Sequence, residues 1–257
     1  MTRRVTSRAR RALSLLRSDP SASVAGFLRD YFRSPASKYV VQVGANDGLQ
    51  SDPLRPFLKQ PGNYRAVLLE PLPYYANALR ELYAGRTDII VRECAAGPEE
   101  GRAELYFIDP AMADRMNGDG PRNDWAHGQG SLDRSSVEYW IRANAFRGAT
   151  YRRSIPEYIA SIRVATVPIV PLSTVMDSHA TNALLCIDMQ GRELDVLLGV
   201  DWMNPPRYVV YEDDLGKGEE VARFLVGKGY RYVCGKNDKV YEFHDSSTRG
   251  CSTSVLP

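Results

Sequence analysis

Short, continuous apolar runs recur along the chain and are separated by longer amphipathic stretches. The clearest runs are residues 39–43, 66–70 and 183–188, in which aliphatic side chains occupy most positions. Runs of this kind are typical of strands that are buried on both faces of a parallel sheet. The stretches between them have helical spacing, so we predict a doubly wound α/β fold with helices on both faces of the sheet.

Further strands and helices complete the predicted fold. Strands are expected at 88–94, 103–108, 163–170 and 207–212, and helices at 138–145, 155–162, 191–198 and 219–228. Residues 230–233 and 240–243 flank the turn at 236–238 and indicate a closing antiparallel pair. Together these elements predict a mostly parallel seven-stranded sheet with an antiparallel final strand.

A glycine loop follows the first apolar run directly. Residues 44–48 are G-A-N-D-G, and such small or turn-forming residues let the backbone bend sharply and approach a ligand closely. Asp52 is placed to cap the next helix, with Pro53 at the first helical position. Because the third glycine of G-x-G-x-x-G is missing, a cofactor without a pyrophosphate fits this loop better than a dinucleotide.

Acidic residues end two of the predicted core strands. Glu70 ends the second strand, where an acid in an adenosine-binding fold can accept hydrogen bonds from both ribose hydroxyls, unless it is only a surface acid. Asp188 ends a strand expected beside the first one, so Gly44 and Asp188 would face each other at the topological switch point. Asp188 is therefore a candidate general base, with a helix cap as the alternative role.

Residues 109–162 are the least regular stretch of the chain. The portion at 114–129 is polar and rich in glycine and asparagine. A segment this long inside a compact domain is commonly functional, so we predict a lid or substrate-binding insertion. His127 lies within it and is a second candidate for the general base, although a histidine in a loop is more often a bystander.

Charge is unevenly distributed along the sequence. The net charge is +2, but six arginines and no acid lie in the first 17 residues, so the remaining 240 carry 27 basic and 31 acidic side chains. This acidic balance argues against a nucleic-acid partner. Residues 1–36 are predicted to form a basic helical arm, which could lie on an anionic membrane surface or pack on its own domain, and 37–257 the main domain.

Composition predicts a soluble cytoplasmic protein. No apolar run approaches ~18 residues, and no apolar core of a secretory signal follows the basic start. Cys94, Cys186, Cys234 and Cys251 form no C-x-x-C pair, so reduced thiols are expected. Peripheral contact with the inner face of the membrane through the arm, and homo-oligomerisation, stay open.

Three segments together resemble a known family. V-G-A-N-D-G at 43–48, L-L-E-P-L-P at 68–73 and I-D-M-Q-G-R-E at 187–193 are similar, in order and spacing, to the signature segments of FkbM-type S-adenosylmethionine-dependent methyltransferases. The resemblance covers residues 37–243. It implies a Rossmann-like methyltransferase fold and O-methylation of a small-molecule acceptor by S-adenosylmethionine, at a hydroxyl of a sugar, glycolipid or polyketide-type natural product.

The resemblance also implies which residues contact the cofactor. The family has small residues where this chain has 95–97, against which the adenine would lie, and G-Q-G-S-L at 128–132 resembles a family segment near the cofactor. The expected cofactor-binding residues are Gln42, Gly44, Ala45, Asn46, Gly48, Asp52, Glu70, Ala95, Ser131 and Asp188.

The chain departs from the family pattern at three positions. Gln42 stands where a first-strand acid is common, and Cys186 and Gln190 stand where the family usually has lysine and glutamate. A glutamine can still hydrogen-bond the cofactor. The departures make a non-catalytic adenosine-binding module an alternative to an active methyltransferase. An NAD-dependent oxidoreductase is a second alternative.

A cluster of acids closes the strand at 207–212. Asp188 with Glu212 or Asp213 could form an oxygen-rich site for Mg²⁺, because hard cations prefer such ligands. Acids at strand ends also cap turns or remain solvated, which is the alternative for all three residues.

Overall fold

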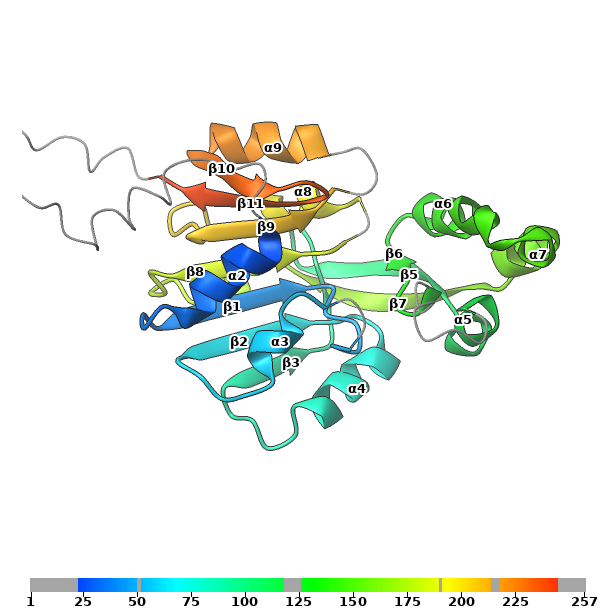
Figure 1. Ribbon diagram of the computed structural model, residues 1–257, viewed down its shortest axis with the longest axis horizontal. Helices are drawn as coiled ribbons and strands as arrows, with labels where there is room; N and C mark the ends of the chain where they lie inside the picture. The colour runs from blue at the N-terminus through cyan, green and yellow to red at the C-terminus, as the bar shows by residue number, and fades with distance from the viewer. Residues whose placement is uncertain (1–22, 50–51, 118–125, 190, 214–217, 245–257) are drawn as a thin grey trace, which may run out of the picture.

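The computed structural model describes residues 23–49, 52–117, 126–189, 191–213 and 218–244. Two sheets organise the chain, one of seven strands and one of four strands that carries a projecting group of helices (Figure 1). The arginines of the first 17 residues and Gln190 lie outside the described residues. Within the part that is described, no helix is long and apolar enough to cross a membrane.

The seven-stranded sheet confirms the predicted α/β fold. Its strands are β1 (Lys38–Val43), β2 (Tyr64–Leu69), β3 (Ile89–Arg92), β8 (Ala183–Ile187), β9 (Tyr208–Glu212), β10 (Tyr230–Gly235) and β11 (Asp238–Phe243), in the order β10-β11-β9-β8-β1-β2-β3. The strands from β9 to β3 in this order are parallel, whereas β11 runs antiparallel to both of its neighbours. Because β1 lies between β2 and β8, the strand order reverses at β1.

Apolar side chains fill both faces of this sheet, as its continuous apolar strands require. Helices α8 (Glu193–Leu198) and α9 (Gly218–Gly227) cover one face with Val196 and Leu225. The helices over the other face are α2 (Val24–Arg33), α3 (Arg55–Leu58) and α4 (Pro73–Leu82). The two apolar layers hold the carboxyl ends of the parallel strands in fixed positions.

Helix α2 is part of the core of the domain. Leu28 and Tyr31 are buried, and the Tyr31 hydroxyl donates a hydrogen bond to the carbonyl oxygen of Asn182 at 2.8 Å. Phe32 stacks on Phe57 of α3, with ring centroids 4.7 Å apart. Helix α2 thus packs on the same domain as the sheet, although it precedes the boundary predicted after residue 36.

The four-stranded sheet, in the order β4-β7-β5-β6, was not predicted. Its strands are β4 (Ala95–Ala96), β5 (Gly101–Ile108), β6 (Gly130–Ser131) and β7 (Ile162–Val170). β5 and β7 pair antiparallel along the whole of β5. The strands predicted at 103–108 and 163–170 therefore exist, but both belong to this second sheet.

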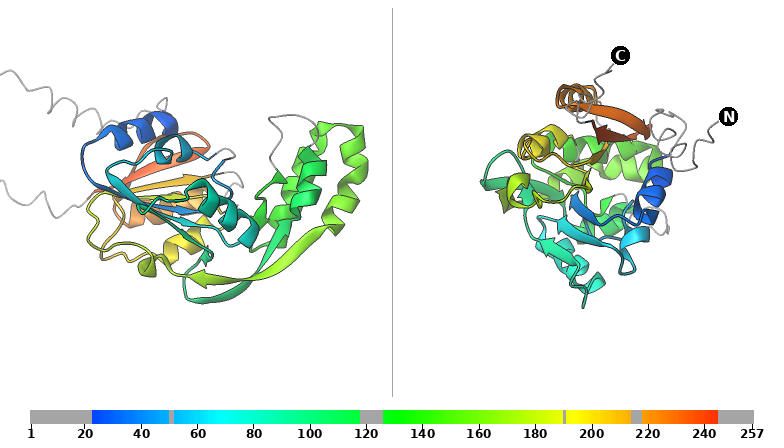
Figure 2. Two further views of the ribbon diagram at one scale, coloured as in Figure 1. Left: turned by 90° about the horizontal axis from the view of Figure 1, so that it is seen from below. Right: turned by 90° about the vertical axis from the view of Figure 1, so that its left-hand side faces the viewer.

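Helices α5 (Pro110–Asn117), α6 (Arg134–Ala143) and α7 (Ala149–Ala160), with the short turn η2 (Asn144–Arg147), form the far end of the β5–β7 pair. They project away from the seven-stranded sheet (Figures 1 and 2). Val137, Ile141 and Tyr158 share a small core there. The helices predicted at 138–145 and 155–162 start later in the sequence than α6 and α7 do. The cap of α6 is Asp133, whose carboxylate accepts the N–H of Ser135 at 2.9 Å.

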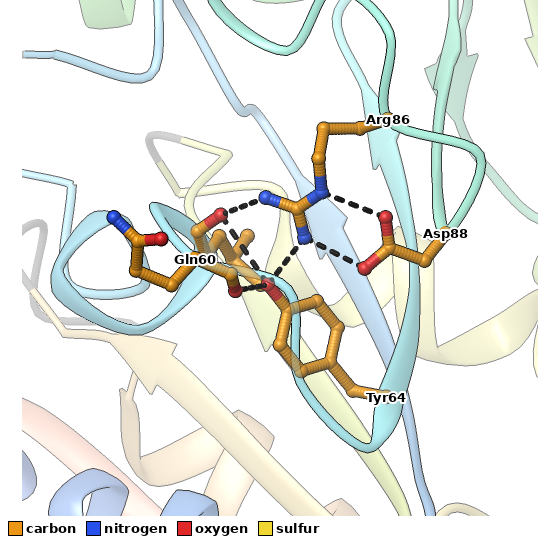
Figure 3. Close-up of polar contacts among 5 residues, drawn as sticks. Gln60, Tyr64, Arg86 and Asp88 are labelled. Atoms are coloured by element: carbon orange, nitrogen blue, oxygen red, sulfur yellow. Dashed lines mark hydrogen bonds and ion pairs between the residues drawn. The ribbon is translucent and has the colours of Figure 1, made fainter.

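A polar cluster fixes the amino ends of β2 and β3 (Figure 3). Arg86 donates to both carboxylate oxygens of Asp88 at 2.7 and 2.6 Å and to the Tyr64 hydroxyl at 2.7 Å. The Tyr64 hydroxyl donates in turn to the carbonyl of Gln60 at 2.6 Å. The Arg86 guanidinium holds the pKa of Asp88 below its ordinary value. This cluster lies at the edge of the sheet opposite the glycine loop, so its role is structural.

Candidate functional site

The glycine loop lies where the carboxyl ends of β1, β2 and β8 meet. The N–H groups of Gly44 and Ala45 donate to the carbonyl of Leu69 at 3.1 and 3.0 Å, and the N–H of Asp188 donates to the carbonyl of Val43 at 3.0 Å. Gly44 and Asp188 are therefore neighbours across the β1–β8 pair. This is the switch point at which open α/β sheets bind their ligands.

Two glycines of the loop are required by their surroundings. Gly44 has φ +78°, and an added Cβ would overlap the carbonyl oxygen of Asp188. Gly48 has φ +67° and lies against the Leu79 side chain of α4. Gly48 thus serves the packing of the loop on α4, whereas Gly44 allows β1 and β8 to approach each other at the site.

Glu70 is buried next to the glycine loop. Its Oε2 accepts the N–H of Asn46 and its Oε1 accepts the N–H of Leu72, both at 2.9 Å. Burial raises the pKa of Glu70 to about 7, although the two hydrogen bonds oppose the rise. Each carboxylate oxygen keeps a further lone pair. Glu70 therefore fixes the loop and can still accept hydrogen bonds from a ligand.

Asn46 connects the glycine loop to the segment after α5. Its backbone has φ +50°, a left-handed conformation that asparagine tolerates. Its Nδ2 lies 3.5 Å from the carbonyl oxygen of His127, and the N–H of Gly128 donates to the Tyr75 hydroxyl at 2.8 Å. The Asn46 Oδ1 atom is buried and has no hydrogen-bond partner in the described structure. A ligand that donates a hydrogen bond would satisfy it.

Gln42, which is buried, and the half-buried Asp52 form a pair that supports the loop. The Gln42 Nε2 donates to Oδ1 of Asp52 at 3.0 Å, and the same oxygen accepts the N–H of Leu54 at 2.8 Å. Burial raises the pKa of Asp52. The prediction that Asp52 caps a helix whose first residue is Pro53 is wrong. Helix α3 begins only at Arg55, and Asp52 caps the turn that leads into it.

Asp188 is exposed at this edge and lies close to a second acid, Glu193. Glu193 is the first residue of α8 and is buried, and its Oε1 accepts the N–H of Gly191 at 2.9 Å. Burial, and secondarily the charge of Asp188, raise the pKa of Glu193. Asp188 thus presents an exposed carboxylate, while Glu193 orders the turn beneath it.

The three predicted metal ligands are not gathered into one group in the described structure. Asp213 accepts the N–H of Gly218 at 2.8 Å and forms an ion pair with Lys239, so it anchors the start of α9. Across the described ranges, no group of three or more His, Cys, Asp or Glu side chains is arranged to hold a metal ion. The residues present therefore do not fit an Mg²⁺ site built from Asp188, Glu212 and Asp213.

Two predicted cofactor contacts lie in the second sheet. Ala95 is buried in β4 and pairs with Ile169 of β7. Ser131 is buried in β6, and its Oγ accepts the N–H of Asp133 in the turn before α6. The structure thus explains both residues by packing and capping, and their contact with a cofactor stays a prediction.

His127 is paired with a carboxylate that the sequence did not reveal. Its Nε2 lies 2.8 Å from Oδ1 of Asp114 in α5. Because an ionised carboxylate only accepts hydrogen bonds, Nε2 carries the proton in neutral His127 and Nδ1 carries the lone pair. The His127 backbone lies beside Asn46, so this pair stands over the glycine loop.

A cleft of about 330 Å³ opens between the second sheet and the segment after β8. Leu132, Ile169 and Met189 supply apolar walls, and its polar lining includes Glu104, Tyr106, Arg192 and Asp195. The Tyr106 hydroxyl donates to Glu104 at 2.6 Å, and Nε of Arg192 lies 2.5 Å from Oδ2 of Asp195. Since Met189 directly follows Asp188, the cleft adjoins the exposed carboxylate.

Sequence reasoning missed Asp114, Tyr75 and the lining of this cleft. Asp114 lies in the stretch that was predicted to be irregular, and only the fold of α5 brings it to His127. Glu193, in contrast, had a usable signal, because an acid at a helix start after a glycine is well placed to accept backbone N–H groups.

Comparison with protein families gives one match. The model of the methyltransferase FkbM domain matches residues 42–232, which is most of the chain. No curated protein matches the chain.

Three solved structures are similar to the chain at low identity. Methyltransferase FkbM from Methylobacillus flagellatus KT is 14% identical, with 80% of this chain and 44% of that one covered and a TM-score of 0.46. Precorrin-6y C5,15-methyltransferase from Geobacter metallireducens GS-15 is 9% identical over 86% and 88%, with a TM-score of 0.41. The METTL16 methyltransferase domain is 7% identical over 85% and 66%, with a TM-score of 0.40. The chain spans less than half the length of the FkbM structure that it matches.

Proposed function

Because the chain belongs to the FkbM methyltransferase family, we propose that it transfers a methyl group from S-adenosylmethionine to a hydroxyl of a sugar, glycolipid or polyketide-type natural product. The observation that carries this proposal is Glu70, a buried carboxylate at the end of β2 and in contact with the glycine loop. Its remaining lone pairs suit the two adjacent hydroxyls of a ribose.

The residues at the switch point fit such a cofactor. Glu70 would hold the ribose, and the buried Oδ1 of Asn46 offers an acceptor without a partner in the described structure. The bound cofactor supplies an electrophilic methyl group. The chain's own task is then to orient an acceptor hydroxyl and to remove its proton as the attack proceeds.

Two groups are candidates for that proton transfer. The exposed carboxylate of Asp188 can accept a proton directly. The Nδ1 atom of His127 can accept one while Asp114 stabilises the imidazolium that forms, which is the arrangement of a paired general base. Both stand at the edge where the glycine loop lies.

The cleft beside Met189 supports a polyhydroxylated acceptor. Apolar walls with Tyr106 can cover one face of a sugar ring, while Glu104, Arg192 and Asp195 can hydrogen-bond its hydroxyls. Two carboxylates and one guanidinium give this lining an acidic balance, which disfavours a strongly anionic acceptor.

Calorimetric titration tests the cofactor assignment. We expect S-adenosylhomocysteine to bind the full chain and NAD not to bind. Glu70→Ala should weaken S-adenosylhomocysteine binding by ~1.5–3 kcal/mol, the contribution of hydrogen bonds to a charged group. Glu81→Ala, which removes an exposed acid from α4, is the matched control and should bind as the wild type does. Binding of NAD alone would replace the proposal by an oxidoreductase, and unchanged affinity in Glu70→Ala would remove Glu70 from the ribose site.

Methyl transfer from labelled S-adenosylmethionine to a panel of methyl glycosides tests the chemistry. Asp188→Asn keeps the side-chain shape, and His127→Gln keeps an N–H donor that can face Asp114. The variant that loses the general base should lose about 10²–10⁴-fold in turnover while it still binds S-adenosylhomocysteine. Binding without transfer to any hydroxylated acceptor, in the wild type as well, would favour the non-catalytic adenosine-binding module.

A further inference from the structure

The corner where α6 meets α7 is basic, although residues 18–257 as a whole have more acidic than basic side chains. Between Glu138 and Glu157 the chain carries Arg142, Arg147, Arg152 and Arg153 and no acidic residue. These arginines belong to the last turn of α6, to η2 and to the amino-terminal part of α7, so the fold gathers them at one corner. We call these four arginines, with Phe146, the basic corner.

The basic corner also exposes an aromatic side chain. Phe146 in η2 is 78% exposed, and the guanidinium of Arg147 lies over its ring, 5.8 Å from the centroid. Arg142, Arg152 and Arg153 are exposed as well. A phenylalanine that is exposed in an ordered turn, with Arg147 over its ring, is not explained by packing within the described chain.

The turn that presents Phe146 is rigidly held. Asn144 is buried, its Nδ2 donates to the carbonyl of Trp140 at 2.9 Å, and its Oδ1 accepts from Nε of Arg147 at 2.9 Å. Ile141 and Tyr151 pack beneath it, and the Tyr151 hydroxyl donates to the carbonyl of Ile141 at 2.9 Å. The exposed ring is therefore preorganised by its own small core.

The basic corner belongs to the helices that project beyond the β5–β7 pair, away from the seven-stranded sheet and its covering helices (Figures 1 and 2). A flat partner could therefore meet this end of the molecule without displacing any element of the larger sheet.

We infer that the basic corner docks on an anionic lipid bilayer, with the arginines against the headgroups and Phe146 inserted at the interface. Charge complementarity selects an anionic partner, and an exposed aromatic ring among arginines matches the interfacial region of a membrane, where aromatic residues partition. A single-stranded nucleic acid could also use the arginines and stack a base on Phe146, so it is the rival partner that the experiments below separate from a bilayer. This surface is independent of the basic residues at the start of the chain and of the proposed catalytic function.

Vesicle sedimentation of the full chain tests this inference. We expect the wild type to sediment with vesicles of phosphatidylcholine mixed with phosphatidylglycerol and not with phosphatidylcholine alone. The combined variant Phe146→Ser, Arg152→Glu and Arg153→Glu should bind the mixed vesicles at least about tenfold more weakly than the wild type does. Each basic residue near such a surface contributes a substantial part of the attraction. All chains keep the same N-terminus, so the difference reports the corner alone.

A matched control removes the same charge elsewhere. Val226→Ser, Arg223→Glu and Arg231→Glu change one exposed apolar and two exposed basic residues on the larger domain. Its binding should equal that of the wild type. Equal losses in both combined variants, or no loss in the corner variant, would overturn the inference.

Insertion of the Phe146 ring into the bilayer can be measured separately by fluorescence. This measurement still tests the inference if the combined variant fails to fold. In Phe146→Trp the indole emission should shift to the blue with mixed vesicles and be quenched by brominated lipid, relative to the wild type. An emission unchanged by vesicles would overturn the inference. So would tighter capture by RNA than by vesicles, whether or not the affinity for RNA depends on Phe146.

Discussion

Glu70, the buried acid at the end of β2, has two roles that make opposite demands on its charge. Glu70 orders the glycine loop by accepting the N–H groups of Asn46 and Leu72, and burial opposes its ionisation. A neutral carboxyl is a weaker acceptor than a carboxylate for the hydroxyls of a ribose. The charge of Glu70 is therefore costly to the fold and useful to the proposed ligand.

The titration of Glu70 predicts how stability depends on pH. Its pKa is about 7 in the folded protein against an ordinary value of 4.5, so the folded state binds the proton more tightly than the unfolded chain does. The resulting stabilisation is complete below the unfolded pKa and is lost as pH rises through the folded pKa. Between about pH 5 and 7 the free energy of unfolding should therefore fall more steeply in the wild type than in Glu70→Gln, by about 1 kcal/mol per pH unit.

Urea unfolding at several pH values measures this slope. Asp52 and Glu193, whose pKa values are also raised by burial, are unchanged in both proteins, so the comparison isolates Glu70. Parallel curves for the two proteins would mean that Glu70 does not titrate in this window.

Two departures from the family pattern are adjacent in the structure. Gln42 of β1 is paired in register with Cys186 of β8. At these two positions the family usually has an acid and a lysine, so the resemblance implies opposite charges on the two neighbouring strands. In this chain both side chains, Gln42 and Cys186, are neutral. Gln42 instead bonds to Asp52. The two replacements together keep the strand interface free of an unpaired charge, so they need not signal lost chemistry.

At the scale of elements, the approach of β1 to β8 depends on one glycine. Gly44→Ala should destabilise the fold because its Cβ would overlap the carbonyl of Asp188. Gly85→Ala is a matched control, because Gly85 has the same φ of +78° but nothing within 4 Å of an added Cβ. The control carries only the left-handed backbone strain of ~1–2 kcal/mol, so Gly44→Ala should cost at least about 2 kcal/mol more.

Denaturant unfolding of the two alanine variants decides this prediction. If both variants lose the same free energy of unfolding, backbone strain alone explains why position 44 is a glycine. In that case β8 can move away from β1 at no cost in stability. Retention of S-adenosylhomocysteine binding in Gly85→Ala, together with its loss in Gly44→Ala, would further place the proposed cofactor at this strand pair.

The elements that could be predicted from the sequence were those with local signals. The core strands β1, β2, β8 and β9 are continuous apolar runs, and the glycine loop has a recognisable composition. The second sheet could not be predicted, because β5 pairs with β7 across more than fifty intervening residues and nothing local encodes that partner. For the same reason Asp114 could not be assigned to His127, although His127 itself was a candidate.

At the scale of the whole molecule, function is proposed where three parts meet. The seven-stranded sheet supplies the glycine loop and Asp188, α5 supplies Asp114, and the second sheet supplies Tyr106 and Glu104. The hydrogen bond from Gly128 to Tyr75 joins the segment between α5 and β6 to α4. The larger sheet thus carries Gly44, Glu70 and Asp188. The second sheet and the start of α8 line the cleft proposed for the acceptor, and the projecting helices α6 and α7 carry the basic corner proposed for the membrane.

The extent of the folded unit leads to the last prediction. A chain that begins at Ser23 keeps α2, whereas one that begins at Pro35 lacks it and exposes the surface that Leu28 and Tyr31 cover. Fully burying a large apolar side chain contributes about 1.5–3 kcal/mol, and α2 contributes several such side chains, so the shorter chain should lose most of the stability of a domain of this size. The chain from Ser23 is the reference against which this loss is measured. Leu28→Ala in the full chain is the point-variant counterpart and should cost ~2–5 kcal/mol, because it leaves a cavity over the sheet.

Thermal unfolding followed by circular dichroism compares all four proteins. If the chain from Pro35 were as stable as the chain from Ser23, α2 would be an appendage, and the boundary first predicted at residue 36 would stand.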